Sequence, residues 1–108
     1  MAKTKVAKAS EIAANTMKGI PINGKFVLVA NVNGNFYGME GICSHQGGHL
    51  WEGKLMEFVL KCPRHGSEYD VRTGKLLKGP WVPFGKAHDL PAYNITVEGD
   101  DLFAELPG

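Results

Sequence analysis

Long apolar runs are missing from this sequence: the longest, residues 26–30, is far shorter than the ~20 residues of a membrane-spanning helix. The N-terminal end also lacks an apolar signal core. Neither sign of charge predominates: the net charge is +1, and 21% of residues are charged. Lys and Arg occur only as single residues and never in runs. This balance argues against intrinsic disorder and against a nucleic-acid-binding surface. We therefore expect a soluble, unexported, cytoplasmic protein with no membrane span and no nucleic-acid partner.

Internal repeats and low-complexity segments are also absent from the 108 residues. A chain of this length buries roughly 60–70% of its unfolded surface, which gives room for one hydrophobic core but not for a second domain. We therefore expect a single domain, residues 1–108. Glycine is abundant: it makes up 14 of the 108 residues, nearly twice the average share of ~7%. Such a content is typical of chains built from short strands joined by turns.

Cysteine is scarce, with two residues, and each lies within three positions of a histidine. The pairs are Cys43 with His45 and Cys62 with His65, and sixteen residues separate them. Two thiolates and two imidazoles suit a soft or borderline metal, and turn-forming residues adjoin both pairs. A disulfide is the other common use of two cysteines, but the adjacent histidines favour metal ligands in a reducing compartment.

The residues alone leave three other interpretations open. The four side chains suffice for a tetrahedral zinc site, which would make the protein a zinc-stabilised interaction module. A nucleophilic Cys62–His65 dyad leaves the first pair without a role. The simplest alternative is two buried thiols and two ordinary surface imidazoles.

The C-x-H and C-x-x-H pairs resemble the signature of the Rieske iron–sulfur family. Residues 65–70 followed by 72–74 are similar to the family's second cluster loop and the strand that leaves it, and residues 79–83 resemble its proline-rich third loop. By motif the resemblance covers about residues 36–84, which we expect to form the cluster-binding subdomain. It implies an all-β Rieske fold of small antiparallel sheets, with two ligand loops and the proline-rich loop.

The resemblance also implies a [2Fe-2S] cluster with ligands from both loops. Cys43 and Cys62 would hold one iron, and His45 and His65 the other. The chain alternates Cys, His, Cys, His, whereas zinc modules usually pair like with like. With this alternation each loop reaches both irons, which favours the two-iron cluster over zinc.

Two hydroxyl residues follow the second pair, Ser67 and Tyr69. In high-potential members of the family, hydroxyls at these positions donate hydrogen bonds to a bridging sulfide and to a ligand sulfur, which raises the potential. Gly48 and Arg64 stand where respiratory members carry a disulfide. The sequence therefore combines the hydroxyls of one group with the missing disulfide of the soluble Rieske-type ferredoxins.

The function implied is one-electron transport by a soluble ferredoxin that is not itself an enzyme. Its partners would be a reductase and an oxygenase or other acceptor, met through transient interfaces, and we expect a monomer. The alternatives are the zinc-stabilised module and a small Rieske subunit of a nitrite-reductase-type complex.

Local patterns predict the strands. We expect an opening strand over residues 4–8 and a single helical turn that is capped by Ser10 and extends through Asn15. Asn-Gly dipeptides at 23–24 and 33–34 predict two-residue hairpins. Alternation predicts one strand over 56–61 that leads from the first ligand loop to the second, another over 93–98, and a closing strand over 102–106.

Four large side chains near the motifs receive no ligand role. His49 and His88 match no family ligand, so we expect both at the surface. Trp51 and Trp81 are interpreted as apolar cover, which excludes water from a buried cluster.

Overall fold

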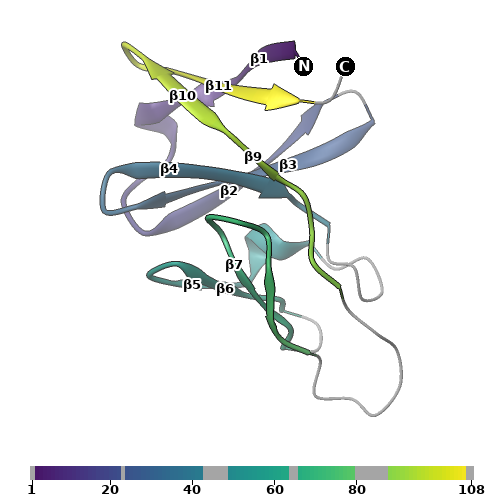
Figure 1. The fold of residues 1–108 in the computed structure, drawn as a ribbon. Coiled ribbons are helices and arrows are strands. Elements are labelled where there is room, and N and C mark those ends of the chain that lie inside the picture. Colours follow the sequence, from purple (N-terminus) through teal and green to yellow (C-terminus); the bar gives the residue numbers. More distant parts are fainter. Residues whose placement is uncertain (1, 23, 43–48, 64–65, 80–87, 107–108) are drawn as a thin grey trace.

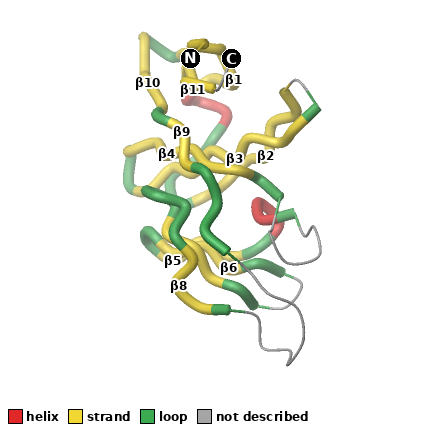
Figure 2. The backbone as a smooth tube through the Cα atoms, turned by 45° about the vertical axis from the view of Figure 1, so that its right-hand side comes forward, coloured by secondary structure: helices red, strands yellow, loops and turns green. Residues whose placement is uncertain are grey.

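The computed structural model describes residues 2–22, 24–42, 49–63, 66–79 and 88–106. These residues form strands and two short 3₁₀ turns with no α-helix among them, which confirms the all-β prediction (Figure 1). Three small antiparallel sheets account for all the strands described. Figure 2 shows a three-stranded sheet at one end, a four-stranded sheet in the middle and a second four-stranded sheet at the other end. No helix in the described ranges has the length and apolar character needed to cross a membrane.

The strands divide among the sheets in a simple order. The three-stranded sheet has the order β1 (Ala2–Lys8), β11 (Asp101–Leu106), β10 (Ile95–Glu98). The middle sheet has the order β2 (Thr16–Ile22), β3 (Lys25–Val32), β4 (Asn35–Glu40), β9 (Ala92–Tyr93). The last sheet has the order β5 (Lys54–Met56), β6 (Val59–Lys61), β7 (Glu68–Asp70), β8 (Leu76–Lys78). The 3₁₀ turns are η1 (Ala9–Glu11) and η2 (Leu50–Glu52).

The strands on either side of both Asn-Gly dipeptides pair as two hairpins, as predicted. β2 and β3 pair up to Ile22 with Lys25, and β3 and β4 pair up to Val32 with Asn35. Asn33 and Gly34 both have positive φ, 53° and 93°, which is the pattern of a type I′ turn. The opening and closing strands are likewise confirmed, and they pair with each other.

The single strand predicted over residues 56–61 is wrong. The chain instead forms the β5–β6 hairpin, in which Met56 pairs with Val59 across a two-residue loop. Glu57 has a φ of 55°, so the chain reverses at a residue that rarely takes this conformation. The predicted strand over 93–98 is divided, because Tyr93 pairs with Gly38 of the middle sheet whereas Ile95 pairs with Ala104 of the three-stranded sheet.

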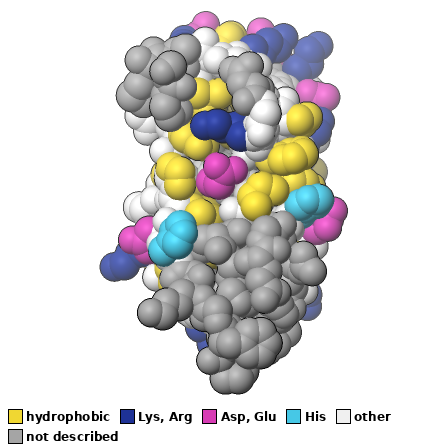
Figure 3. Space-filling view, turned by 90° about the vertical axis from the view of Figure 1, so that its right-hand side faces the viewer, with side chains coloured by type: hydrophobic (Ala, Val, Ile, Leu, Met, Phe, Trp, Pro, Cys, Tyr) yellow, Lys and Arg dark blue, Asp and Glu magenta, His cyan; other side chains and the backbone are white. Residues whose placement is uncertain are grey.

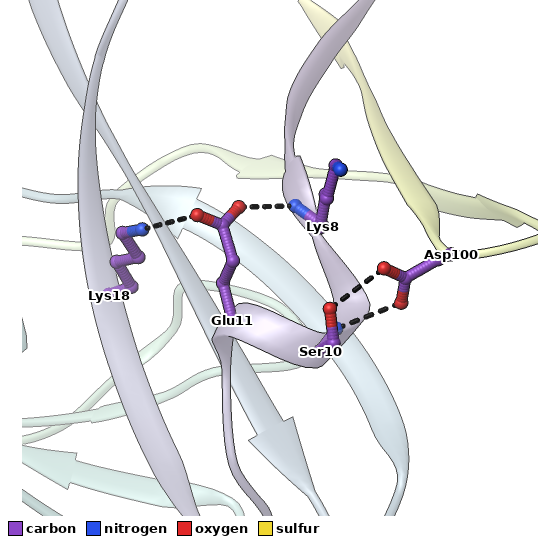
Figure 4. A network of polar contacts seen from close by, with 5 residues as sticks. All are labelled: Lys8, Ser10, Glu11, Lys18 and Asp100. Carbon is purple, nitrogen blue, oxygen red and sulfur yellow. Dashed lines mark hydrogen bonds and ion pairs between the residues drawn. The ribbon is translucent and has the colours of Figure 1, made fainter.

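The predicted cap at Ser10 is also wrong. The 3₁₀ turn begins one residue earlier, at Ala9, so Ser10 lies inside it. The Ser10 hydroxyl donates to Asp100 Oδ2 over 2.7 Å, and its backbone N–H donates to Oδ1 over 3.0 Å (Figure 4). Glu11 accepts a bond from the Lys8 N–H and lies 3.5 Å from Lys18 Nζ, and both contacts lower the pKa of Glu11. The polar network therefore fastens η1 to the turn between β10 and β11.

Strand β3 lies between two hydrophobic cores, because residues 27–32 are all buried. Leu28, Ala30 and Val32 face the first core, on the side of the last sheet. Val27 and Val29 face the second core, on the side of the three-stranded sheet. A strand that is buried on both faces reads as a continuous apolar run, which is why residues 26–30 contain the longest run in the sequence.

Candidate metal centre

Three of the six predicted site residues lie within the described part of the chain. These are Cys62, Ser67 and Tyr69. The other three, Cys43, His45 and His65, lie outside the described residues, as do Gly48, Arg64, Trp81 and most of the predicted third loop. The geometry of the site is therefore built from the second loop and from the residues that begin and end the other two.

Cys62 and Ser67 are joined by a tight turn between β6 and β7. The Cys62 N–H donates to the Ser67 carbonyl over 2.8 Å, and the Gly66 N–H donates to the Cys62 carbonyl over 3.3 Å. Gly66 has a φ of 80°, a conformation that glycine adopts without steric cost. Both side chains are buried, with 2% of Cys62 and 1% of Ser67 exposed. A thiol and a hydroxyl, carried by two residues whose backbones are bonded, are therefore both sheltered from water.

The Ser67 hydroxyl is a buried, unsatisfied polar group, because its Oγ has no hydrogen-bond partner among the described residues. A buried hydroxyl without a partner costs about 1–3 kcal/mol, so such groups usually meet an acceptor. An inorganic sulfide bound near Cys62 would supply one. The buried thiol of Cys62 and the buried, unsatisfied hydroxyl of Ser67 thus fit an iron–sulfur cluster on this chain's own chemistry.

Tyr69 completes this side of the site from strand β7. It is fully buried, pairs with Leu60 across β6 and β7, and belongs to the first core together with Cys62. A buried phenol carries a donor into an apolar setting, which is consistent with the hydrogen-bonding role that the resemblance implies.

A charged pair fixes the turn that follows Tyr69. Arg72 donates from Nε to Asp70 Oδ1 over 3.0 Å and from Nη2 to Oδ2 over 2.9 Å, and its guanidinium carbon lies 4.1 Å from the Phe58 ring centroid. The Phe58 ring meets Tyr37 of β4 edge-on at 5.9 Å. The bonds from Arg72 hold the pKa of Asp70 below its usual value of 3.8. This chain of contacts ties the β6–β7 side of the site to the middle sheet.

The segments flanking all three predicted loops contribute to the first core. Leu50 follows the first loop, Cys62 begins the second and Leu90 follows the third, and all three side chains are buried there. Ile42 and His49 pair as an isolated antiparallel bridge, which brings the two ends of the first loop together. Because these three side chains pack in one core, the segments that flank the loops are held in fixed positions relative to one another.

Polar bonds that no sequence motif predicts join the segments before and after the third loop. Asp89 Oδ1 accepts from the Leu76 N–H over 2.8 Å, and the Leu90 N–H donates to the Gly74 carbonyl over 2.8 Å. A Cβ on Gly74 would meet the Leu90 carbonyl oxygen at 1.9 Å. Neither Asp89 nor Gly74 carries a motif that points to this role, since both depend on pairing between distant segments.

A cavity of ≈ 320 Å³ adjoins Cys62. It is lined by Glu52, Gly53, Lys54, Lys61, Cys62 and Pro63. Lys54 and Lys61 stand directly opposite each other in the β5–β6 pairing, an arrangement of like charges that does not stabilise a sheet. A Cβ on Gly53 would lie 1.8 Å from the Lys61 carbonyl oxygen, so glycine allows the end of η2 to approach β6.

The large side chains near the motifs to which we assign no ligand role lie at or close to the surface within the described ranges. His49 and His88 are both exposed, as expected. Trp51 is half-buried against the middle sheet, consistent with apolar cover. Within the described ranges no three His, Cys, Asp or Glu side chains gather around one point, and three of the four predicted ligands lie outside those ranges.

Comparison with known proteins gives a consistent result. The Rieske [2Fe-2S] domain family matches residues 2–94. The ferredoxin component of biphenyl 2,3-dioxygenase from Rhodococcus jostii (strain RHA1) is 34% identical over 109 residues, covering 100% of this chain and 96% of that protein. Sulredoxin from Sulfurisphaera tokodaii is 39% identical over 83 residues, 74% of this chain and 72% of that protein.

Solved structures agree in fold. The ferredoxin of carbazole 1,9a-dioxygenase from Nocardioides aromaticivorans IC177 superimposes with a TM-score of 0.84 at 24% identity, covering 96% of this chain and 97% of that one. A chain in a complex of reduced oxygenase and oxidised ferredoxin of carbazole 1,9a-dioxygenase gives a TM-score of 0.83 at 27% identity, with coverage of 94% and 91%.

Proposed function

The chain belongs to the Rieske [2Fe-2S] family, and from this premise we propose that it is the ferredoxin component of a dioxygenase system, passing single electrons to an oxygenase. Family membership gives the cofactor, a Rieske [2Fe-2S] cluster. The class, an electron carrier that is not itself an enzyme, follows from the ferredoxin relatives. One observation carries the proposal: the biphenyl dioxygenase ferredoxin is matched over 96% of its own length, so the similarity is to a complete carrier component.

We assign the ligands as the sequence predicts them. Cys43 and Cys62 would bind one iron, and His45 and His65 the other. The burial of Cys62 supports this assignment, because a thiolate in a water-free turn is protected from exchange. Ser67 and Tyr69 would donate hydrogen bonds toward the sulfurs, and the unsatisfied Ser67 hydroxyl supports the first of these roles.

The cluster supplies reversible one-electron chemistry, and its mixed ligand set places its potential within about −150 to +300 mV. The protein's own part is to bury the sulfur side of the site, to hold the loop ends in one core and to leave a face for partners. We propose a reductase as electron source and an oxygenase as acceptor, each bound transiently by a monomeric, cytoplasmic carrier.

Spectroscopy of the purified protein tests the cofactor. We expect a reddish-brown protein with about two iron atoms per chain and an electron paramagnetic resonance signal that appears on one-electron reduction. Cys62→Ser should abolish the visible spectrum, because a hydroxyl does not replace thiolate affinity for iron. A colourless protein with zinc bound, or a Cys62→Ser variant with native iron content, would overturn the assignment.

Reconstitution tests the partner. The protein, mixed with the reductase and oxygenase components of an aromatic-ring dioxygenase, should restore substrate-dependent oxygen consumption, and omitting it should abolish the activity. Size-exclusion chromatography of a cell lysate separates a free carrier from a permanent subunit, since the latter would elute with a much larger complex. Failure to reduce any oxygenase despite an intact cluster would contradict the partner assignment alone.

A further inference from the structure

Three aromatic rings meet where the first loop ends, and we call them the aromatic triad: Phe26 of β3, His49, and Trp51 of η2. The Trp51 ring lies 4.9 Å from Phe26 and 4.5 Å from His49, and it is within 11° of parallel to the imidazole. Phe26 and His49 are 5.9 Å apart, so the rings form a compact triangle and not a column. Such separations are typical of attractive ring contacts.

Two glycines make room for the indole. A Cβ on Gly19 of β2 would meet the Trp51 ring at 2.2 Å, and one on Gly41 would meet it at 3.0 Å. Neither glycine has a positive φ, so backbone conformation does not require glycine at either position. The requirement is steric: Trp51 lies flat on β2 because Gly19 has no side chain.

The backbone is fastened at the same place. The Gly41 N–H donates to the Phe26 carbonyl over 2.8 Å, and the Leu50 N–H donates to the Gly41 carbonyl over 3.0 Å. The bridge between Ile42 and His49 lies beside these bonds. The residue that follows β4, Gly41, is therefore bonded to β3, and Leu50 is bonded to Gly41. His49 is held both by its backbone bridge to Ile42 and by its ring contacts with Phe26 and Trp51.

The triad lies at the edge of the first core: Trp51 is half-buried against that core, and His49 is exposed. The His49 side chain is 46% exposed, and its Nδ1 lies 3.4 Å from Glu52 Oε2, a weak surface contact. Figure 3 shows histidine and hydrophobic side chains together on one face of the molecule. Truncating Trp51 removes two ring contacts while leaving the buried Leu50 in place.

We propose that Trp51 is a positioning residue: through the aromatic triad it clamps the end of the first ligand loop to the middle sheet, and so controls how long the [2Fe-2S] cluster is retained. This inference rests on the proposed function, because it takes residues 43–48 as a ligand loop. The Rieske disulfide positions hold Gly48 and Arg64, so the two loops lack that covalent link. Attachment of each loop to the body of the protein then governs release of the cluster.

The experiment measures two quantities on the protein as purified. The first is the rate at which visible absorbance is lost in excess chelator. The second is hydrogen exchange at the Leu50 amide, which reports local opening of the loop end with or without a cluster. Trp51→Ala should release the cluster roughly tenfold faster, with a similar loss of Leu50 protection. Trp51→Phe, which keeps a ring, should restore most of both.

Two further variants separate positioning from general stability. Gly19→Ala should reproduce the Trp51→Ala result with the indole still present, because the methyl group displaces the ring. Gly99→Ala is the control: its φ of 63° strains an alanine, but its Cβ meets nothing within 4 Å and it lies in the β10–β11 turn. It should lower the melting temperature without changing cluster release.

The outcomes are distinct. Wild-type release and exchange in both Trp51→Ala and Gly19→Ala would overturn the inference, as would equal acceleration by Gly99→Ala. If no variant and no wild-type protein held a cluster, the proposed function would fail, whereas the exchange measurement at Leu50 would still decide whether the clamp exists.

Discussion

Among single residues, Ser67 has an unusual environment, because its hydroxyl is buried and unsatisfied. It is 1% exposed and has no hydrogen-bond partner among the described residues. We expect Ser67→Ala to lower the reduction potential by roughly 65–130 mV, because a bond to the reduced cluster contributes about 1.5–3 kcal/mol. Tyr69→Phe should act in the same direction. Redox titration of the two variants is the measurement.

Ser10→Ala is the matched control for this prediction. Its hydroxyl is bonded to Asp100 beside the three-stranded sheet, so removing it should lower stability by about 1 kcal/mol and leave the potential unchanged. If Ser67→Ala also left the potential unchanged, the Ser67 hydroxyl would not face the cluster.

At this scale the sequence predicts the chemistry of the site but not its environment. The spacing of Cys62 and His65 from the first pair indicated a metal, and the resemblance named the two hydroxyls. No local pattern predicts that Cys62 and Ser67 are both buried, or that the Cys62 N–H bonds to the Ser67 carbonyl. Asp89 was missed for the same reason, since its partner is thirteen residues away.

Among the elements, the β5–β6 hairpin differs clearly from the single strand that the sequence pattern predicts. Its loop, Glu57 and Phe58, contains none of the residues that favour turns. Positive φ at Glu57 but not at Phe58 matches the sign pattern of a type II′ turn, which favours glycine at the first position. The hairpin forms regardless, because Phe58 packs against Tyr37 and Arg72.

The positive φ at Glu57 leads to a prediction about the free energy of unfolding. Glu57→Gly should raise the free energy of unfolding by about 0.5–1 kcal/mol, because it relieves a left-handed conformation that costs a non-glycine residue about 1 kcal/mol or more. Glu68→Gly, in the extended strand β7, should lower it. Urea denaturation of the two variants checks the signs, and a destabilised Glu57→Gly would show that the glutamate side chain contributes more than the strain removes.

The Asp70–Arg72 pair in the turn after β7 should make the stability of the fold depend on pH. Arg72 lowers the pKa of Asp70 in the folded protein, so this carboxylate stabilises the fold fully above its ordinary value of 3.8. That contribution is lost as the pH falls through the lower, folded-state value. Arg72→Gln should therefore be less stable than wild type at neutral pH, and the difference should shrink below pH 3.8. Thermal melts across this range measure it; a gap independent of pH would point to the Phe58 contact instead.

At the scale of the whole molecule, the middle sheet joins two cores. The sequence predicts its two hairpins correctly because Asn-Gly loops are local signals. It does not predict that the chain leaves the middle sheet at Asn94, since the patterns of β9 and β10 run on without a break. That division is decided by the distant partners Gly38 and Ala104. Pairings of this kind depend on packing that only the folded chain provides.

Two valines of β3 test whether the cores act together. Val32 faces the first core and Val29 the second, and they are 1% and 0% exposed. Val32→Ala and Val29→Ala should each cost roughly 2 kcal/mol, from lost burial and the cavity left behind. If residues 1–108 form one domain, as we propose, each variant should still unfold in a single transition with a lower midpoint.

The same pair separates stability from retention of the cluster. The first core contains Cys62 and the buried residues that follow the first and third loops, whereas the second core contains none of them. Val32→Ala should therefore speed cluster release in chelator, and Val29→Ala should leave the rate near that of wild type at temperatures well below its midpoint. Equal acceleration by the two variants would mean that the cluster leaves only when the whole chain unfolds. In that case the first core would not be a local frame for the loops, and the same global opening would govern both folding and cofactor loss.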